Sequence, residues 1–161
     1  MLHPVEFAHT SDCVTLNEEK IQILKDLFAY GRSRWQFKTF TAAAATITAE
    51  ITPTSAPSGV PTSEPTTTLQ PTAAPSVSQR PTTILENSKP VVSFRLDDVQ
   101  AFWCADIQET VIDLFLAESV PVNLGIIGEF MDTSEPVSSY LNGLAGNPLV
   151  EMSSHSFIHE S

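Results

Sequence analysis

A stretch rich in proline, threonine and serine divides this chain into two parts that can fold. Seven of the 12 prolines in the 161 residues lie between Pro53 and Pro81. Such a segment has too few apolar side chains to offset the entropy cost of ordering its backbone. We therefore expect a disordered linker over residues 52–89, between an N-terminal segment (1–51) and a C-terminal domain (90–161). Proline beside threonine and serine is also typical of O-glycosylated stalks, and an unmodified spacer is the alternative.

The N-terminal segment predicts one amphipathic helix over residues 15–30. Thr15 or Asn17 supplies an N-cap, and Gly31 ends the helix. The apolar side chains recur at helical spacing on one side, at Ile21, Leu24, Leu27 and Phe28.

Signals for secretion are mixed. Residues 1–20 contain four acids and lack a basic start, so they do not resemble a signal peptide. Residues 32–49 run from basic to weakly apolar to small, which is the order of a secretion signal, although their threonine-rich core is poorly hydrophobic. The sequence contains no run of about 18 apolar residues, so no membrane-spanning helix is predicted. The stalk-like linker leads us to expect an extracellular or cell-wall location.

Charge is distributed unevenly. The net charge is -11, yet the first 95 residues hold eight acids and eight bases, so the imbalance lies in the eleven acids after Arg95. No basic patch exists there for nucleic acid. A divalent cation would relieve part of the repulsion, while a solvated acidic surface is the alternative reading. Cys13 and Cys104 form neither a disulfide framework nor a zinc-ribbon spacing, and their redox state stays open.

The C-terminal domain alternates strands and helices, and we assign it to the α/β class. This β-α-β-α-β order predicts a parallel sheet with right-handed crossovers. Functional residues in such folds lie at the carboxyl ends of the strands. The expected strands cover 91–96, 121–128 and 149–152, and the expected helices cover 101–118 and 138–144.

Candidate metal ligands follow the first and third of these strands. Asp97 and Asp98 are adjacent acids after an apolar run, where they would be partly desolvated and mutually repelled without a cation. His155 and His159 are four residues apart, and on one helical turn they would lie about 40° apart and face one ion. Each pair alone is also typical of solvated turns or capping residues. Together they predict a mononuclear metal site of the hydrolase type.

These residues resemble the motifs of the NodB-like polysaccharide deacetylases, a carbohydrate esterase family. The family's first motif reads Thr-Phe-Asp-Asp-Gly, which Asp97 and Asp98 match, with Leu96 in place of Phe and Val99 in place of Gly. Its second motif reads His-(Ser/Thr)-x-x-His, which residues 155–159 match fully. Residues 121–128 lie where the family has its second strand.

The resemblance implies the first three β-α units of a distorted (β/α) barrel. It also implies a general base, Asp97, and three ligands of a divalent metal (zinc, cobalt or another ion), namely Asp98, His155 and His159. Such an enzyme hydrolyses a non-peptide C–N bond of an N-acetylated polysaccharide, releasing acetate and an amino sugar.

The resemblance covers about 72 residues, 90–161. Later family motifs are not matched, among them an arginine-containing substrate loop and a late histidine that acts as general acid. We therefore expect an incomplete domain without deacetylase activity of its own. We also expect it to be only partly ordered, because three parallel strands leave an open edge and an uncovered barrel face. The alternative is a non-catalytic cell-wall or surface protein with a mucin-like stalk and a degenerate carbohydrate-binding α/β module.

Overall fold

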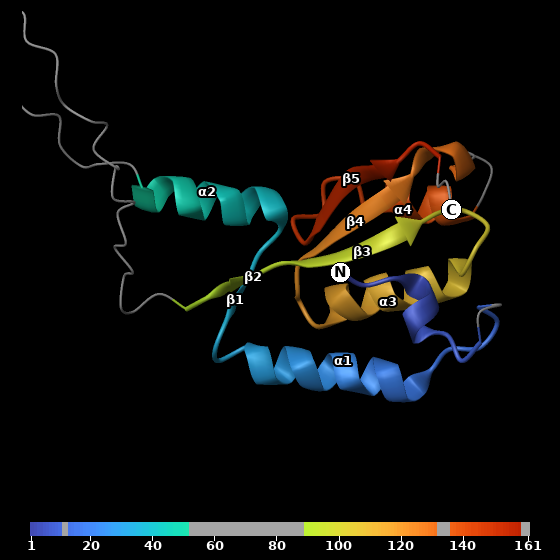
Figure 1. The fold of residues 1–161 in the computed structure, drawn as a ribbon, viewed down its shortest axis with the longest axis horizontal. Coiled ribbons are helices and arrows are strands. Elements are labelled where there is room, and N and C mark those ends of the chain that lie inside the picture. Colours follow the sequence, from blue (N-terminus) through green and yellow to red (C-terminus); the bar gives the residue numbers. More distant parts are fainter. Residues whose placement is uncertain (11–12, 52–88, 132–135, 159–161) are drawn as a thin grey trace, which may run out of the picture.

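A three-stranded parallel sheet lies at the centre of the molecule (Figure 1). The computed structural model describes residues 1–10, 13–51, 89–131 and 136–158. Its strands are β3 (Phe94–Val99), β4 (Val122–Ile127) and β5 (Val150–Ser156), and they lie in the order β3-β4-β5. The expected α/β class is confirmed, and barrel closure stays a prediction. The expected linker lies almost wholly outside the described residues, so its disorder also stays a prediction.

Two helices connect these strands, as the hydrophobic pattern predicts. They are α3 (Ala105–Ala117) and α4 (Pro136–Gly143), and a short 3-10 helix, η2 (Gly128–Phe130), follows β4. Helix α3 begins four residues later than expected, because Cys104 before it has a left-handed backbone (φ 55°). Strand β5 runs on through His155 because Ser154 and Ser156 both pair with β4. The expected helical turn at His155 is therefore wrong.

The N-terminal segment supplies part of the core. Helix α1 (Glu18–Gly31) has the expected position, and its Asn17 cap accepts a hydrogen bond from the backbone N–H of Lys20. The fully buried ring of Phe28 lies 4.9 Å from the ring of Phe115 and 5.4 Å from the ring of Phe94. In Figure 1, α3 lies between the sheet and α1. Helix α1 thus packs on the far side of α3, and the expectation that residues 90–161 leave a barrel face uncovered stays a prediction.

The first residues of the chain also add to the sheet. Leu2 pairs with Leu96 in parallel, since the backbone N–H of Leu2 bonds Arg95 O and the N–H of Asp97 bonds Leu2 O, both at 2.8 Å. A short 3-10 helix, η1 (Pro4–Phe7), follows and buries Phe7. A disulfide between Cys13 and Cys104 then joins this segment to the start of α3.

A second helix, α2 (Phe40–Ile51), occupies the stretch that has the order of a secretion signal. Four consecutive alanines give this stretch high helix propensity. Its first N–H groups are bound by strand side chains, since Phe40 N donates to Asn123 Oδ1 and Thr41 N to Glu151 Oε2, both at 2.9 Å. Before it, β1 (Gln36–Phe37) pairs in parallel with β2 (Val91–Val92). Within the described residues, the search for a helix with the length and apolarity to span a membrane finds none.

Candidate functional site

The sheet has one apolar face and one polar face. Because strand side chains alternate between faces, Leu96 and Leu124 point into the core with α3 while their neighbours point the other way. The cross-strand register places Arg95 beside Asn123 and Asn123 beside Glu151, and one step further Gly125 lies beside Ser153. The polar face thus ends, at the carboxyl ends of the strands, next to the acids and the histidine that the motifs predict.

Both motifs coincide with a shift in strand register. Leu96 pairs with Leu124 and Val99 with Ile126, so Asp97 and Asp98 together lie opposite one residue of β4. Asp98 has a left-handed backbone, φ 59°, which aspartate adopts more readily than most residues. In β5 the shift leaves His155 as the extra residue between two paired serines. Such irregularities re-aim side chains, and they are common beside functional sites.

The imidazole of His155 lies between the two carboxylates. Its Nδ1 is 3.4 Å from Asp97 Oδ1, and its Nε2 is 3.3 Å from Asp98 Oδ1. The side chain of Asp97 is fully buried, whereas that of Asp98 is 13% exposed and that of His155 26% exposed. The structure therefore brings together three of the four predicted site residues. The fourth, His159, lies outside the described residues.

Arg95 holds the buried carboxylate of Asp97. The guanidinium Nε donates to Asp97 Oδ1 at 2.5 Å, and Nη2 lies 3.3 Å from His155 Nδ1. Asp97 Oδ2 is buried and has no hydrogen-bond partner among the described residues. A buried carboxylate oxygen left in this way is uncommon in folded proteins and is found where a ligand or a reaction uses it.

Gly125 provides the space for this ion pair. A Cβ atom at this position would overlap Asp97 Oδ1 and would lie 2.8 Å from Arg95 Nη2. Glycine inside a strand typically marks such a close approach, so the sequence carries a signal for Gly125 that the two motifs do not include. Arg95 also has a signal, because it precedes Asp97 by two residues and so shares its face. The motif-based prediction missed both residues.

His3 is the third residue of the site that the motifs do not predict. Its Nδ1 lies 2.8 Å from Asp98 Oδ2, and its side chain is 35% exposed. The pairing of Leu2 with β3 brings His3 to this position, across 95 residues of sequence. No local pattern around His3 could have predicted the contact.

The described residues include two of the three metal ligands that the resemblance implies. Among them, no three His, Cys, Asp or Glu side chains are arranged to hold a metal ion. Two of the three ligands that the resemblance implies, Asp98 and His155, lie with donor atoms 3.3 Å apart. A carboxylate oxygen and an imidazole nitrogen suit zinc and similar divalent ions. The chemistry of these donors and the unsatisfied Asp97 oxygen beside them fit a divalent metal that takes further ligands from elsewhere.

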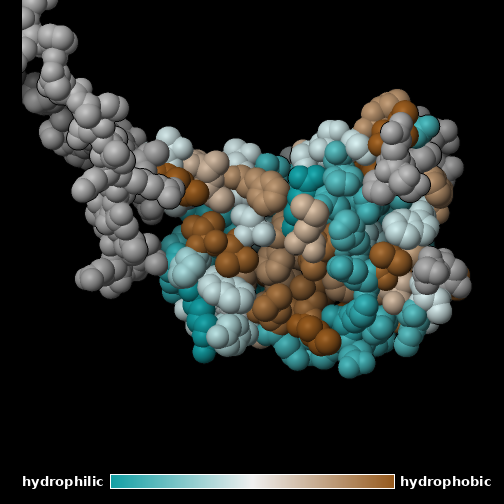
Figure 2. Space-filling view, in the orientation of Figure 1, coloured by the Kyte–Doolittle hydropathy of each residue, from teal (hydrophilic) through white to brown (hydrophobic). Residues whose placement is uncertain are grey.

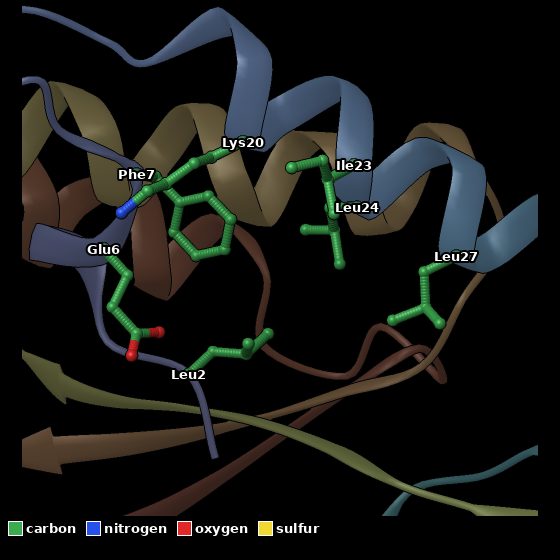
Figure 3. A pocket seen from close by; sticks show the side chains of 7 residues that line it. All are labelled: Leu2, Glu6, Phe7, Lys20, Ile23, Leu24 and Leu27. Atoms are coloured by element: carbon green, nitrogen blue, oxygen red, sulfur yellow. The ribbon is translucent and has the colours of Figure 1, made fainter.

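An apolar hollow of about 310 Å³ lies apart from these side chains, between the first residues and α1 (Figure 3). Figure 2 shows apolar side chains gathered in this part of the surface. Glu6 and Lys20 are its polar members, and the apolar lining is Leu2, Phe7, Ile23, Leu24 and Leu27. The hollow contains no residue of the candidate site.

Comparisons of the chain with known protein families, with curated proteins and with solved structures find no match. A functional assignment therefore rests on the residues described above and on their geometry.

Proposed function

We propose that the polar end of the sheet is the metal-binding and base-bearing part of a polysaccharide deacetylase centre. The observation that supports this most is that one imidazole, His155, lies within 3.4 Å of two adjacent carboxylates in unlike surroundings. Asp97 is fully buried beside a guanidinium, and Asp98 is partly exposed. Neighbouring acids with unlike surroundings are typical of sites where each carboxylate has a separate role.

The roles are those that the resemblance implies, and the surroundings of Asp97 and Asp98 support them. Asp98 and His155, together with His159, would hold the divalent metal, with zinc the first choice and cobalt or another ion the alternatives. When bound, the metal would polarise the acetyl carbonyl and lower the pKa of the attacking water. Asp97 is the general base that takes the proton of this water on Oδ2. Arg95 occupies Oδ1 of the same carboxylate, which orients Oδ2 for that task.

The substrate class that we propose is an N-acetylated polysaccharide outside the cell. The disulfide between Cys13 and Cys104 is typical of proteins from oxidising compartments. It supports the extracellular or cell-wall location that the stalk-like linker predicts.

The leaving group decides how this proposal is best tested. Cleavage of an N-acetyl amide expels an amine that must be protonated, and the resemblance assigns this task to a later motif that the chain does not match. An activated aryl ester expels a stable phenolate that needs no proton donor. We therefore expect metal-dependent hydrolysis of 4-nitrophenyl acetate, and little or no acetate release from N-acetylglucosamine oligomers.

The experiment compares ester hydrolysis by the full chain with added zinc, with cobalt and with a chelator. Asp97→Asn should lower the metal-dependent rate by about 10²-fold or more, the usual contribution of a general base. His155→Ala should lower this rate as well, because it removes a metal ligand. His9→Ala is the control, because His9 is an exposed histidine on the same segment as His3. A rate that neither the chelator nor Asp97→Asn changes would contradict the proposal.

One observation favours the non-catalytic alternative. Both carboxylates already have partners without a metal, since the guanidinium of Arg95 offsets the charge of Asp97 and the imidazole of His3 lies 2.8 Å from Asp98 Oδ2. A carbohydrate-binding module would bind an N-acetylglucosamine oligomer equally well with and without chelator. Titration calorimetry in both conditions separates this function from the hydrolytic one.

A further inference from the structure

We propose that His3 is a positioning residue, whose hydrogen bond orients the carboxylate of Asp98 toward the metal. In this way the first residues of the chain help to form the metal site. This inference rests on the proposed function, since it assigns a role toward the same metal. His3 Nδ1 and Asp98 Oδ2 lie 2.8 Å apart. An ionised carboxylate only accepts hydrogen bonds, so the Nδ1–H of His3 donates in this contact.

The two imidazoles take different oxygens of Asp98. His3 lies at Oδ2, while Nε2 of His155 lies 3.3 Å from Oδ1. The hydrogen bond from His3 therefore fixes the rotation of the carboxylate so that Oδ1 faces His155, the neighbouring ligand. Residues that hydrogen-bond to a metal-ligating carboxylate in this way orient it and stabilise the binding geometry.

His3 is itself held firmly in place. The backbone of Leu2 makes two hydrogen bonds to β3, each 2.8 Å long, and its side chain points into the apolar hollow (Figure 3). Pro4 restricts His3 to an extended backbone, observed at φ -125° and ψ 143°. The backbone N–H of His3 donates to Glu6 Oε2 at 3.1 Å. The imidazole therefore reaches Asp98 from a backbone with little remaining freedom.

The test measures zinc affinity by titration calorimetry on the full chain and its variants. His3→Ala should weaken zinc binding about 10- to 100-fold, the usual effect of removing a residue that hydrogen-bonds to a metal ligand. His3→Asn should restore most of the affinity, because its amide nitrogen lies near the position of Nδ1 and also donates a hydrogen bond. His9→Ala should have no effect. The cobalt absorption spectrum of saturated His3→Ala should match that of the wild type, because the ligands themselves are unchanged.

Three results would overturn this role. Unchanged affinity in His3→Ala would show that the hydrogen bond does not matter for binding. Tighter binding in His3→Ala would show that His3 competes with the metal for Asp98. Equal weakness of His3→Ala and His3→Asn, with an altered cobalt spectrum, would make His3 a direct ligand.

Two further variants separate this inference from the proposed function. If Asp98→Asn and His155→Ala lose zinc binding while His3→Ala does not, the metal site stands and only the role of His3 is wrong. If Asp98→Asn and His155→Ala bind zinc like the wild type, the site itself is wrong, and a role of His3 through Asp98 is wrong with it.

Discussion

Gly125 of β4 lies directly against the carboxylate of Asp97 in β3, so closely that a Cβ atom at residue 125 would overlap Asp97 Oδ1. Gly125→Ala must therefore displace the ion pair between Asp97 and Arg95, both of which lie within the packed sheet. We expect a loss of about 1–3 kcal/mol in the free energy of unfolding, as for other overpacked positions. Urea denaturation followed by circular dichroism measures this loss.

Gly143, at the end of α4, is the matched control for this substitution. A Cβ atom there would meet nothing within 4 Å. Gly143→Ala should leave stability unchanged or raise it by about 0.4–1 kcal/mol, because alanine restricts the unfolded chain. Equal effects of the two substitutions would show that the space at Gly125 has no structural role.

The Cys13–Cys104 disulfide should stabilise the attachment of the first residues to the sheet. The bond joins residues 91 apart in the sequence, and bridges that close long loops restrict the unfolded chain strongly. The double variant with serine at both positions should lose about 2–4 kcal/mol. Urea denaturation of this variant against the oxidised wild type measures the difference. A thiol assay that finds two reactive cysteines in the wild type would contradict the pairing.

Glu109 on α3 should destabilise the fold at neutral pH. Burial raises the pKa of its carboxyl above the ordinary value of 4.5, and the neighbouring Asp106 and Asp113 raise it further. A raised folded-state pKa in an acid means that stability falls as pH rises through that pKa. Glu109→Gln should therefore stabilise the protein at pH 7, by less than about 1 kcal/mol because solvent screens the site. The gain should vanish at pH 3, and melting curves that show equal gains at both values would contradict this expectation.

Glu151 of β5 should stabilise α2 through its carboxylate. Burial acts to raise its pKa, but hydrogen bonds from the N–H and hydroxyl of Thr41, both 2.9 Å long, outweigh burial and lower the pKa. This contribution is present above the ordinary value of 4.5 and is lost as pH falls through the lowered pKa. In Glu151→Gln at pH 7 the Thr41 amide should exchange its hydrogen faster than in the wild type. Unchanged exchange at neutral pH would show that the carboxylate does not cap the helix.

The sequence allowed the helices and the order of strands and helices to be predicted, because these features depend on residues that are close in the chain. The apolar spacing of α1 and α3 and the alternation of strands and helices are properties of neighbouring residues, and both were predicted. The convergence of Asp97, Asp98 and His155 also followed, because parallel strands end at a common edge.

The remaining features depend on contacts between distant residues. Leu2 pairs with β3, and Phe28 packs on Phe115, across long stretches of sequence that carry no local signal. Strand pairing also overrides the helical turn expected at His155, because β5 continues through that residue. The contact of His3 with Asp98 depends on this long-range pairing of Leu2.

The central claim is that Asp98 binds the metal and Asp97 acts as the base. Zinc titration of two matched variants tests it most directly. Each variant, Asp97→Asn and Asp98→Asn, replaces one carboxylate by an amide of the same shape. Asp98→Asn should weaken zinc binding more than about 100-fold, because it changes a ligand itself. Changing a residue that only hydrogen-bonds to a ligand usually weakens binding about 10- to 100-fold. Asp97→Asn should stay within a few-fold of the wild type while losing ester hydrolysis. Equal loss of affinity in both variants, or a wild-type chain that binds no zinc, would contradict the assignment of Asp98 as ligand and Asp97 as base.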